Sequence, residues 1–249
     1  MKRTMVLLVA AVMFLSLGAQ AQAALTVMGT DTLGNQLIYD SALNVTWYDY
    51  THYDSSNLNN DTWTSQMAWA SNLTVNVNGR NISGWNLPTT VDGPLVTNTI
   101  WNNGNPVTNP VYYNGTAADG YNITSSKLGN LYYATLGNKG DYDTSGNSQS
   151  GAGLNNVGPF KHLVLDQYWS STTHANTPDS AWTFDFAYAK GFQGVDTKDY
   201  ISQGDGFVGH SAIAMIDGNV LTPTPIPAAG WLLGSGLMGL FGLRKRETV

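Results

Sequence analysis

The hydrophobic pattern divides the chain into two apolar ends and a long middle region. Apolar runs cover residues 5–17 and 228–243. In the middle region, short stretches alternate apolar and polar residues as β-strands do, and two stretches repeat with the period of an amphipathic helix. The pattern therefore predicts one folded region between two segments with separate roles.

The β pattern is concentrated near the start and the end of the middle region. Runs rich in β-branched and aromatic residues, separated by turn residues, predict short strands. The predicted strands cover residues 36–39, 44–48, 167–171, 181–187 and 211–216.

Helical spacing of apolar residues predicts two helices. The first covers residues 63–73, and either Asp61 or Thr62 can cap its start. The second covers residues 125–136 and ends at Gly137, which suits the left-handed backbone of a helix C-cap.

The remaining middle segments are rich in Asn, Gly, Ser and Thr. Residues 89–124 and 141–158 are predicted to be long loops, the first with room for one hairpin. Two helices, short antiparallel strands and long loops together predict an α+β domain, which we place at residues 24–221.

The amino-terminal segment has the three parts of a secretory signal peptide. Lys2 and Arg3 precede the apolar run, and small residues at Ala19, Ala21 and Ala23 follow it. The run is short for a membrane anchor, and a cleavage pattern comes after it. We predict a signal peptide over residues 1–23 that directs export through the Sec translocon.

The carboxy-terminal segment, residues 222–249, combines a proline hinge, an apolar helix and a basic end. The hinge is Pro225-Ile226-Pro227, and the basic end is Arg244-Lys245-Arg246. A helix over residues 228–243 would span only about 24 Å, against a hydrocarbon core of roughly 30 Å. We predict a transmembrane helix that tethers the exported domain to the inner membrane, with the basic residues on the cytoplasmic side. A plain anchor that is never processed is the alternative.

Charge and composition exclude several classes of function. Residues 24–227 contain six of the 11 basic and 16 of the 17 acidic residues, a net charge of −10. No basic surface for nucleic acid is expected. Every acidic residue in this region is Asp, so HExxH metalloproteases and Glu-based glycosidases are excluded. Cysteine is absent, so a packed aromatic core has to stabilise the domain.

One loop has the ligand spacing of a calcium site. Asp141, Asp143, Ser145 and Asn147 fall at positions 1, 3, 5 and 7 of a loop with Gly146 at position 6. The carboxylate expected at position 12 is missing. A cluster of Asx and glycine turns is the alternative, and no other cofactor is predicted.

Two groups of side chains are of residue types that can carry catalysis or ligand binding. The four histidines are His52, His162, His174 and His210, and no nucleophile elbow, HxxxH or HxH pattern accompanies them, so no catalytic residue is predicted. Aromatic residues in Asn-rich loops are candidates for sugar binding, with packing of the loop as the alternative. These are Trp101, Tyr112, Tyr113 and Tyr121. Four other tryptophans are predicted core: Trp47, Trp85, Trp169 and Trp182.

Four sequence blocks in order resemble the DUF1566 family, also called the Lcl C-terminal domain. They read IYDSALNVTW (38–47), GWNLPT (84–89), LGNLYY (128–133) and YWSST (168–172). The resemblance implies a C-type-lectin-like or formylglycine-enzyme-like fold, with binding to polysaccharide through long loops. Ile213 and Ile216 stand where the family commonly has Trp and Arg.

The tail resembles the PEP-CTERM sorting signal, although Ile226 replaces the name-giving Glu. This resemblance implies processing by an exosortase in a Gram-negative bacterium. The expected protein is therefore exported, tethered briefly and then placed on the cell surface or in the extracellular matrix, where it binds polysaccharide without catalysis. A hydrolytic or formylglycine-type enzyme and a purely structural matrix protein remain as alternatives.

Overall fold

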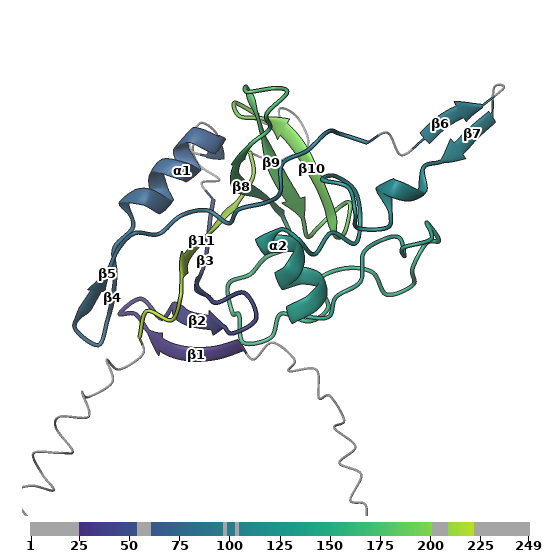
Figure 1. Ribbon diagram of the computed structural model, residues 1–249. Coiled ribbons are helices and arrows are strands. Elements are labelled where there is room, and N and C mark those ends of the chain that lie inside the picture. Colours follow the sequence, from purple (N-terminus) through teal and green to yellow (C-terminus); the bar gives the residue numbers. More distant parts are fainter. Residues whose placement is uncertain (1–24, 54–60, 97–98, 103–104, 201–208, 222–249) are drawn as a thin grey trace, which may run out of the picture.

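The computed structural model describes residues 25–53, 61–96, 99–102, 105–200 and 209–221 (Figure 1). The predicted signal peptide, the proline hinge, the apolar tail and the basic end all lie outside the described residues. Within these residues, no helix has both the length and the apolar character needed to cross a membrane. The described part has a mixed α+β fold, as predicted.

The first and last strands of the domain share a four-stranded antiparallel sheet. Its order is β1 (Leu25–Thr30), β2 (Gln36–Asp40), β3 (Val45–His52) and β11 (Ala212–Asp217). The described chain therefore begins and ends on the same side of the domain, beside β1 (Figure 1).

A second antiparallel sheet has the order β10–β9–β8. Its strands are β8 (Gln167–Thr173), β9 (Ser180–Asp185) and β10 (Phe192–Thr197). Ser211 connects the two sheets, because its backbone pairs with both Gln167 and Trp169 of β8 just before β11 begins. The sequence did not predict β10, whose residues include Gly194 and Asp196. This strand exists because all six of its residues pair with β9.

Two hairpins complete the strands. β4 (Val75–Val77) and β5 (Arg80–Ile82) are joined by Asn78-Gly79, with φ angles of 53° and 78°. These positive values identify the tight Asn-Gly turn typical of hairpins. The Asn-Gly pair is visible in the sequence, but no hairpin was predicted there. β6 (Thr99–Asn102) and β7 (Asn105–Thr108) form the hairpin expected between residues 89 and 124.

The two predicted helices are present, but the second is not a regular α-helix. Helix α1 (Trp63–Asn72) begins at Thr62, whose side chain accepts from the backbone N–H of Ser65. Helix α2 (Lys127–Gly129) is only three residues long and continues as the π-helix η3 (Asn130–Thr135). The wide turn of η3 buries residues 131, 132, 135 and 136, and Gly137 with φ of 69° ends it as predicted.

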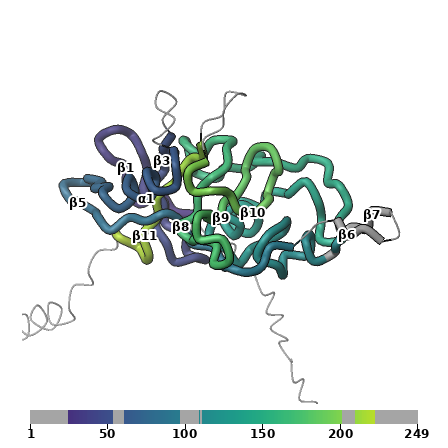
Figure 2. The backbone as a smooth tube through the Cα atoms, turned by 90° about the horizontal axis from the view of Figure 1, so that it is seen from above, coloured from purple at the N-terminus to yellow at the C-terminus, as the bar shows by residue number. Residues whose placement is uncertain are grey.

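Two hydrophobic clusters form the core. One lies between the first sheet and α2–η3, and the other lies beneath α1. Figure 2 shows α1 and the first sheet in one half of the domain, with β8–β10 beside them and the long loops beyond. The core prediction for Trp47, Trp85, Trp169 and Trp182 is confirmed, since each is at most 1% exposed.

Candidate binding surface

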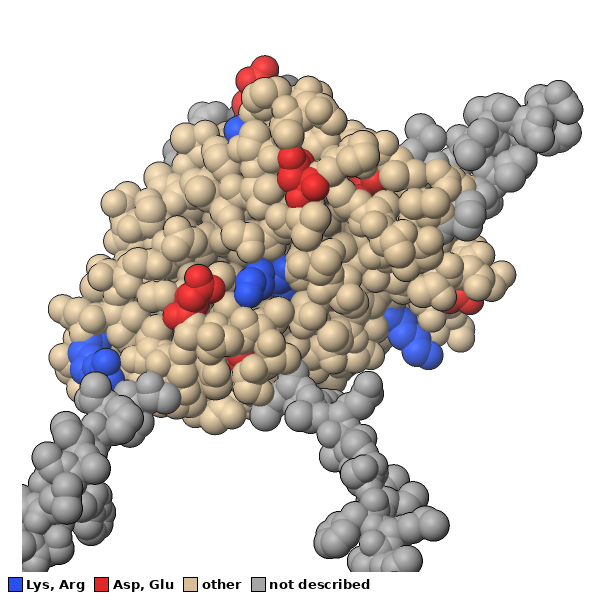
Figure 3. Space-filling model, viewed as in Figure 1, with Lys and Arg blue, Asp and Glu red and all other residues tan. Residues whose placement is uncertain are grey.

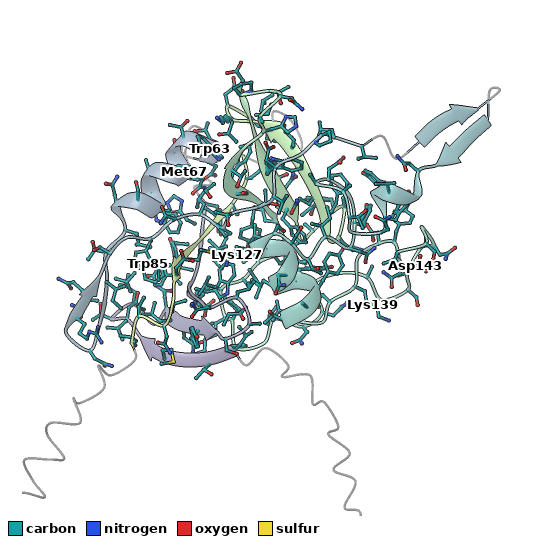
Figure 4. The ribbon with its side chains drawn as sticks, in the orientation of Figure 1. Trp63, Met67, Trp85, Lys127, Lys139 and Asp143 are labelled. Atoms are coloured by element: carbon teal, nitrogen blue, oxygen red, sulfur yellow. The ribbon has the colours of Figure 1, made fainter. Side chains whose placement is uncertain are left out.

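One face of β3 carries a row of aromatic rings that runs from the core to the surface. Tyr48, Tyr50 and His52 lie on the same face, because the Tyr50 ring centroid is 5.9 Å from that of Tyr48 and 6.3 Å from that of His52. Tyr48 is 5% exposed and Tyr50 is 38% exposed. The row begins at buried Trp85, which is labelled in Figure 4. Its ring centroid lies 5.8 Å from that of Tyr48.

Helix α1 adds a tryptophan to the exposed end of this row. The rings of His52 and Trp69 are stacked, with centroids 4.5 Å apart and an interplanar angle of 17°. The Tyr50 ring lies 6.2 Å from Trp69 and 6.3 Å from His52. We call Tyr50, His52 and Trp69 the aromatic platform. Because its rings are packed on one another, the platform is held rigid while remaining partly open to solvent.

Hydrogen bonds fix the inner end of the row. The Tyr48 hydroxyl donates to Asp31 Oδ2 at 2.6 Å and accepts from Asn35 Nδ2 at 2.8 Å. Burial, and then the hydrogen bond to Asp31, raises the pKa of the Tyr48 phenol. Burial alone would raise the pKa of Asp31, but hydrogen bonds from Tyr48 and Asn35 lower it. These bonds tie the β1–β2 turn to the aromatic row.

We expect Tyr48→Phe to destabilise the domain by about 1–2 kcal/mol, because Asp31 and Asn35 lose a buried partner. The pH dependence should change as well. The pKa of Asp31 is lowered in the folded protein, so its contribution is present above the ordinary value of 3.8 and is lost as the pH falls below it. In thermal unfolding between pH 7 and pH 3, the stability of the variant should therefore fall less steeply with decreasing pH than that of the parent. An unchanged profile would contradict this role for the hydroxyl.

A buried glutamine supports the platform from below. Gln66 is 0% exposed, and its Oε1 lies 2.7 Å from His52 Nδ1. Its Nε2 donates to Asp61 Oδ1 at 3.0 Å and to the backbone oxygens of His52 and His210 at 3.3 Å each. Three acceptors around Nε2 fix the orientation of the amide. Oε1 consequently faces His52, whose Nδ1 carries the hydrogen.

The other three histidines have separate structural partners. His210 Nε2 lies 3.1 Å from Asp196 Oδ2, and its ring packs against Trp169 and Tyr200. His174 Nδ1 lies 2.6 Å from the hydroxyl of Thr177. The backbone N–H of His162 donates to the buried carboxylate of Asp49, and the His162 ring lies beside the same carboxylate. Among the described side chains, no three His, Cys, Asp or Glu residues are grouped to hold a metal ion.

The loop proposed for calcium is closed by its own hydrogen bonds. Asp143 Oδ1 accepts from the backbone N–H groups of Ser145 and Asn147 at 2.8 and 2.9 Å, and Oδ2 accepts from Asn147 Nδ2 at 3.0 Å. The hydrogen bond from the Asn147 side chain is the largest of the effects that lower the pKa of Asp143. Asp141 instead faces Lys190, 3.9 Å away. This is the geometry of an Asx turn, and calcium binding stays a prediction.

The tyrosines predicted to bind sugar pack mainly on one another. Tyr113 and Tyr121 are 7% and 6% exposed, and their rings are stacked at 5.9 Å. Tyr112, at the end of the short helix η2 (Pro110–Tyr112), packs edge-on against both. Tyr142, from the loop predicted to bind calcium, joins the same cluster. The cluster holds the long loops together, while the side chain of Trp101 lies outside the described residues.

The sequence predicts no binding role for His52 or Trp69. Tyr48, Tyr50 and His52 nevertheless place aromatic rings at every second position, although Tyr50 and His52 lie beyond the predicted strand of residues 44–48. That spacing shows a shared face, but it does not show that α1 adds a stacked tryptophan.

No family model, curated protein or solved structure matches this chain. The resemblances to the DUF1566 family and to the PEP-CTERM signal therefore stay predictions that depend on the quoted sequence blocks.

Proposed function

We propose that this protein is an exported, surface-attached module that binds polysaccharide without catalysis. The observation that carries the proposal is the aromatic platform, a rigid set of stacked rings that is partly open to solvent. Sugar rings present C–H groups on their faces, and these pack on aromatic faces. Tyr50, at 38% exposed, supplies such a face, and the partly buried Trp69, which stacks on His52, lies beside it.

The arrangement of the domain supports this role. The described chain enters and leaves beside β1, while α1 lies toward the other end of the domain (Figure 1). If residues 222–249 act as a membrane tether that an exosortase processes, the tether would leave from the β1 side. The end of β3 and α1 would then be directed away from the membrane, toward extracellular material. We also retain the C-type-lectin-like or formylglycine-enzyme-like assignment of the fold as part of this proposal.

A glycan array tests the binding function. The purified full-length chain is expected to bind a subset of extended polysaccharides. Unfolding of the protein should abolish this binding. A blank array would contradict the proposal and favour a structural matrix protein. Turnover of an arrayed glycan would instead favour the enzyme alternative.

Mass spectrometry of the native carboxy terminus tests the sorting function separately. If the tail is a processed signal, the mature extracellular protein should lack Arg244–Arg246, because cleavage is expected near the proline hinge. Recovery of these residues in the extracellular product would contradict processing.

A further inference from the structure

We infer that the aromatic platform takes a neutral polysaccharide chain rather than an acidic one. This inference rests on the proposed function and specifies the ligand class for the same surface. It follows from the charges of the domain and from the angle between the platform rings.

The charge of the domain disfavours an acidic polysaccharide. Residues 24–227 carry a net charge of −10, so an anionic polymer is repelled on approach. Lys198, beside the start of α1, lies over the Trp63 ring at 4.2 Å from its centroid. Figure 3 shows a face that is largely uncharged, with basic groups at separate places. Only two of the six basic residues of this region lie in a strand or helix, Arg80 in β5 and Lys127 in α2, and the others lie in separate connecting segments: Lys139, Lys161, Lys190 and Lys198.

The geometry of the rings suits a single twisted chain. The Tyr50 and Trp69 centroids are 6.2 Å apart, and their planes are inclined by 40°. Two rings at that angle cannot both lie flat on one crystalline face. They can stack on successive sugar units of a chain that twists between them. Stacking of this kind uses C–H faces and needs no charge on the sugar.

Affinity electrophoresis of the full-length chain separates the ligand classes. The gels contain a soluble neutral β-glucan or alginate, each at low and at high salt. We expect retardation by the neutral glucan, with an apparent affinity that changes less than about twofold with salt, because salt screens only charged contacts. Tyr50→Ala should weaken this affinity about tenfold. Tyr188→Ala, which removes a 61% exposed tyrosine outside the platform, should leave it unchanged.

The outcomes distinguish this inference from the function on which it rests. Stronger, salt-sensitive retardation by alginate would overturn the neutral class and leave polysaccharide binding intact. No retardation by either polymer would overturn both. Equal losses of affinity in Tyr50→Ala and Tyr188→Ala would show that the platform is not the binding surface.

Discussion

Gln66→Glu is expected to destabilise the folded domain by about 3–5 kcal/mol at neutral pH, because it places an uncompensated charge in the interior. The side chain is 0% exposed, and its Nε2 donates to Asp61 Oδ1 and to two backbone oxygens. A carboxylate in the same position would put oxygen against three acceptors. Chemical denaturation at pH 7 measures this loss directly.

The pH dependence of the same variant gives a second readout. Burial raises the pKa of an introduced carboxyl group above its value in the unfolded chain. The variant should therefore regain stability relative to the parent as the pH falls, since the neutral acid can again donate a hydrogen bond. Gln149→Glu is the matched control, because Gln149 is only partly buried and its Nε2 donates to a single backbone oxygen. Equal effects at both positions would contradict the proposed role of the Gln66 network.

Trp69→Ala is expected to reduce polysaccharide affinity at least tenfold while the domain stays folded. A tenfold change corresponds to about 1.4 kcal/mol, which is in the range of a lost aromatic stacking contact and its buried area. Trp69 is only partly buried, so its removal should cost less stability than removal of a fully buried tryptophan. Isothermal titration calorimetry with the glycan identified on the array measures the affinity, and thermal unfolding measures the stability.

Two further variants make the Trp69 result specific. Trp69→Phe keeps an aromatic face and should recover part of the affinity. Tyr188→Ala removes an exposed ring outside the platform and should bind as the parent does. Full affinity in Trp69→Ala would contradict the platform as the binding surface, whatever its effect on folding.

The sequence determined the local structure of this protein well. Alternation of apolar and polar residues identified β2, β3, β8, β9 and β11, and the Thr62 cap and Gly137 marked two helix ends correctly. These features depend on residues close together in the chain, so a local pattern can show them. Burial of four tryptophans followed for the same reason, because each lies within such a pattern.

Only the tertiary structure decided which aromatic residues are open to solvent. Tyr113 and Tyr121 lie in polar loops, yet β10 and the loop around Tyr142 cover them. Tyr50 lies in a strand, yet the end of α1 leaves it partly exposed beside Trp69. Exposure depends on which distant segments pack together, and the local pattern does not contain that information. The sequence thus determined the elements and the acidic, cysteine-free character of the domain, whereas packing between distant segments decided where a binding surface could form.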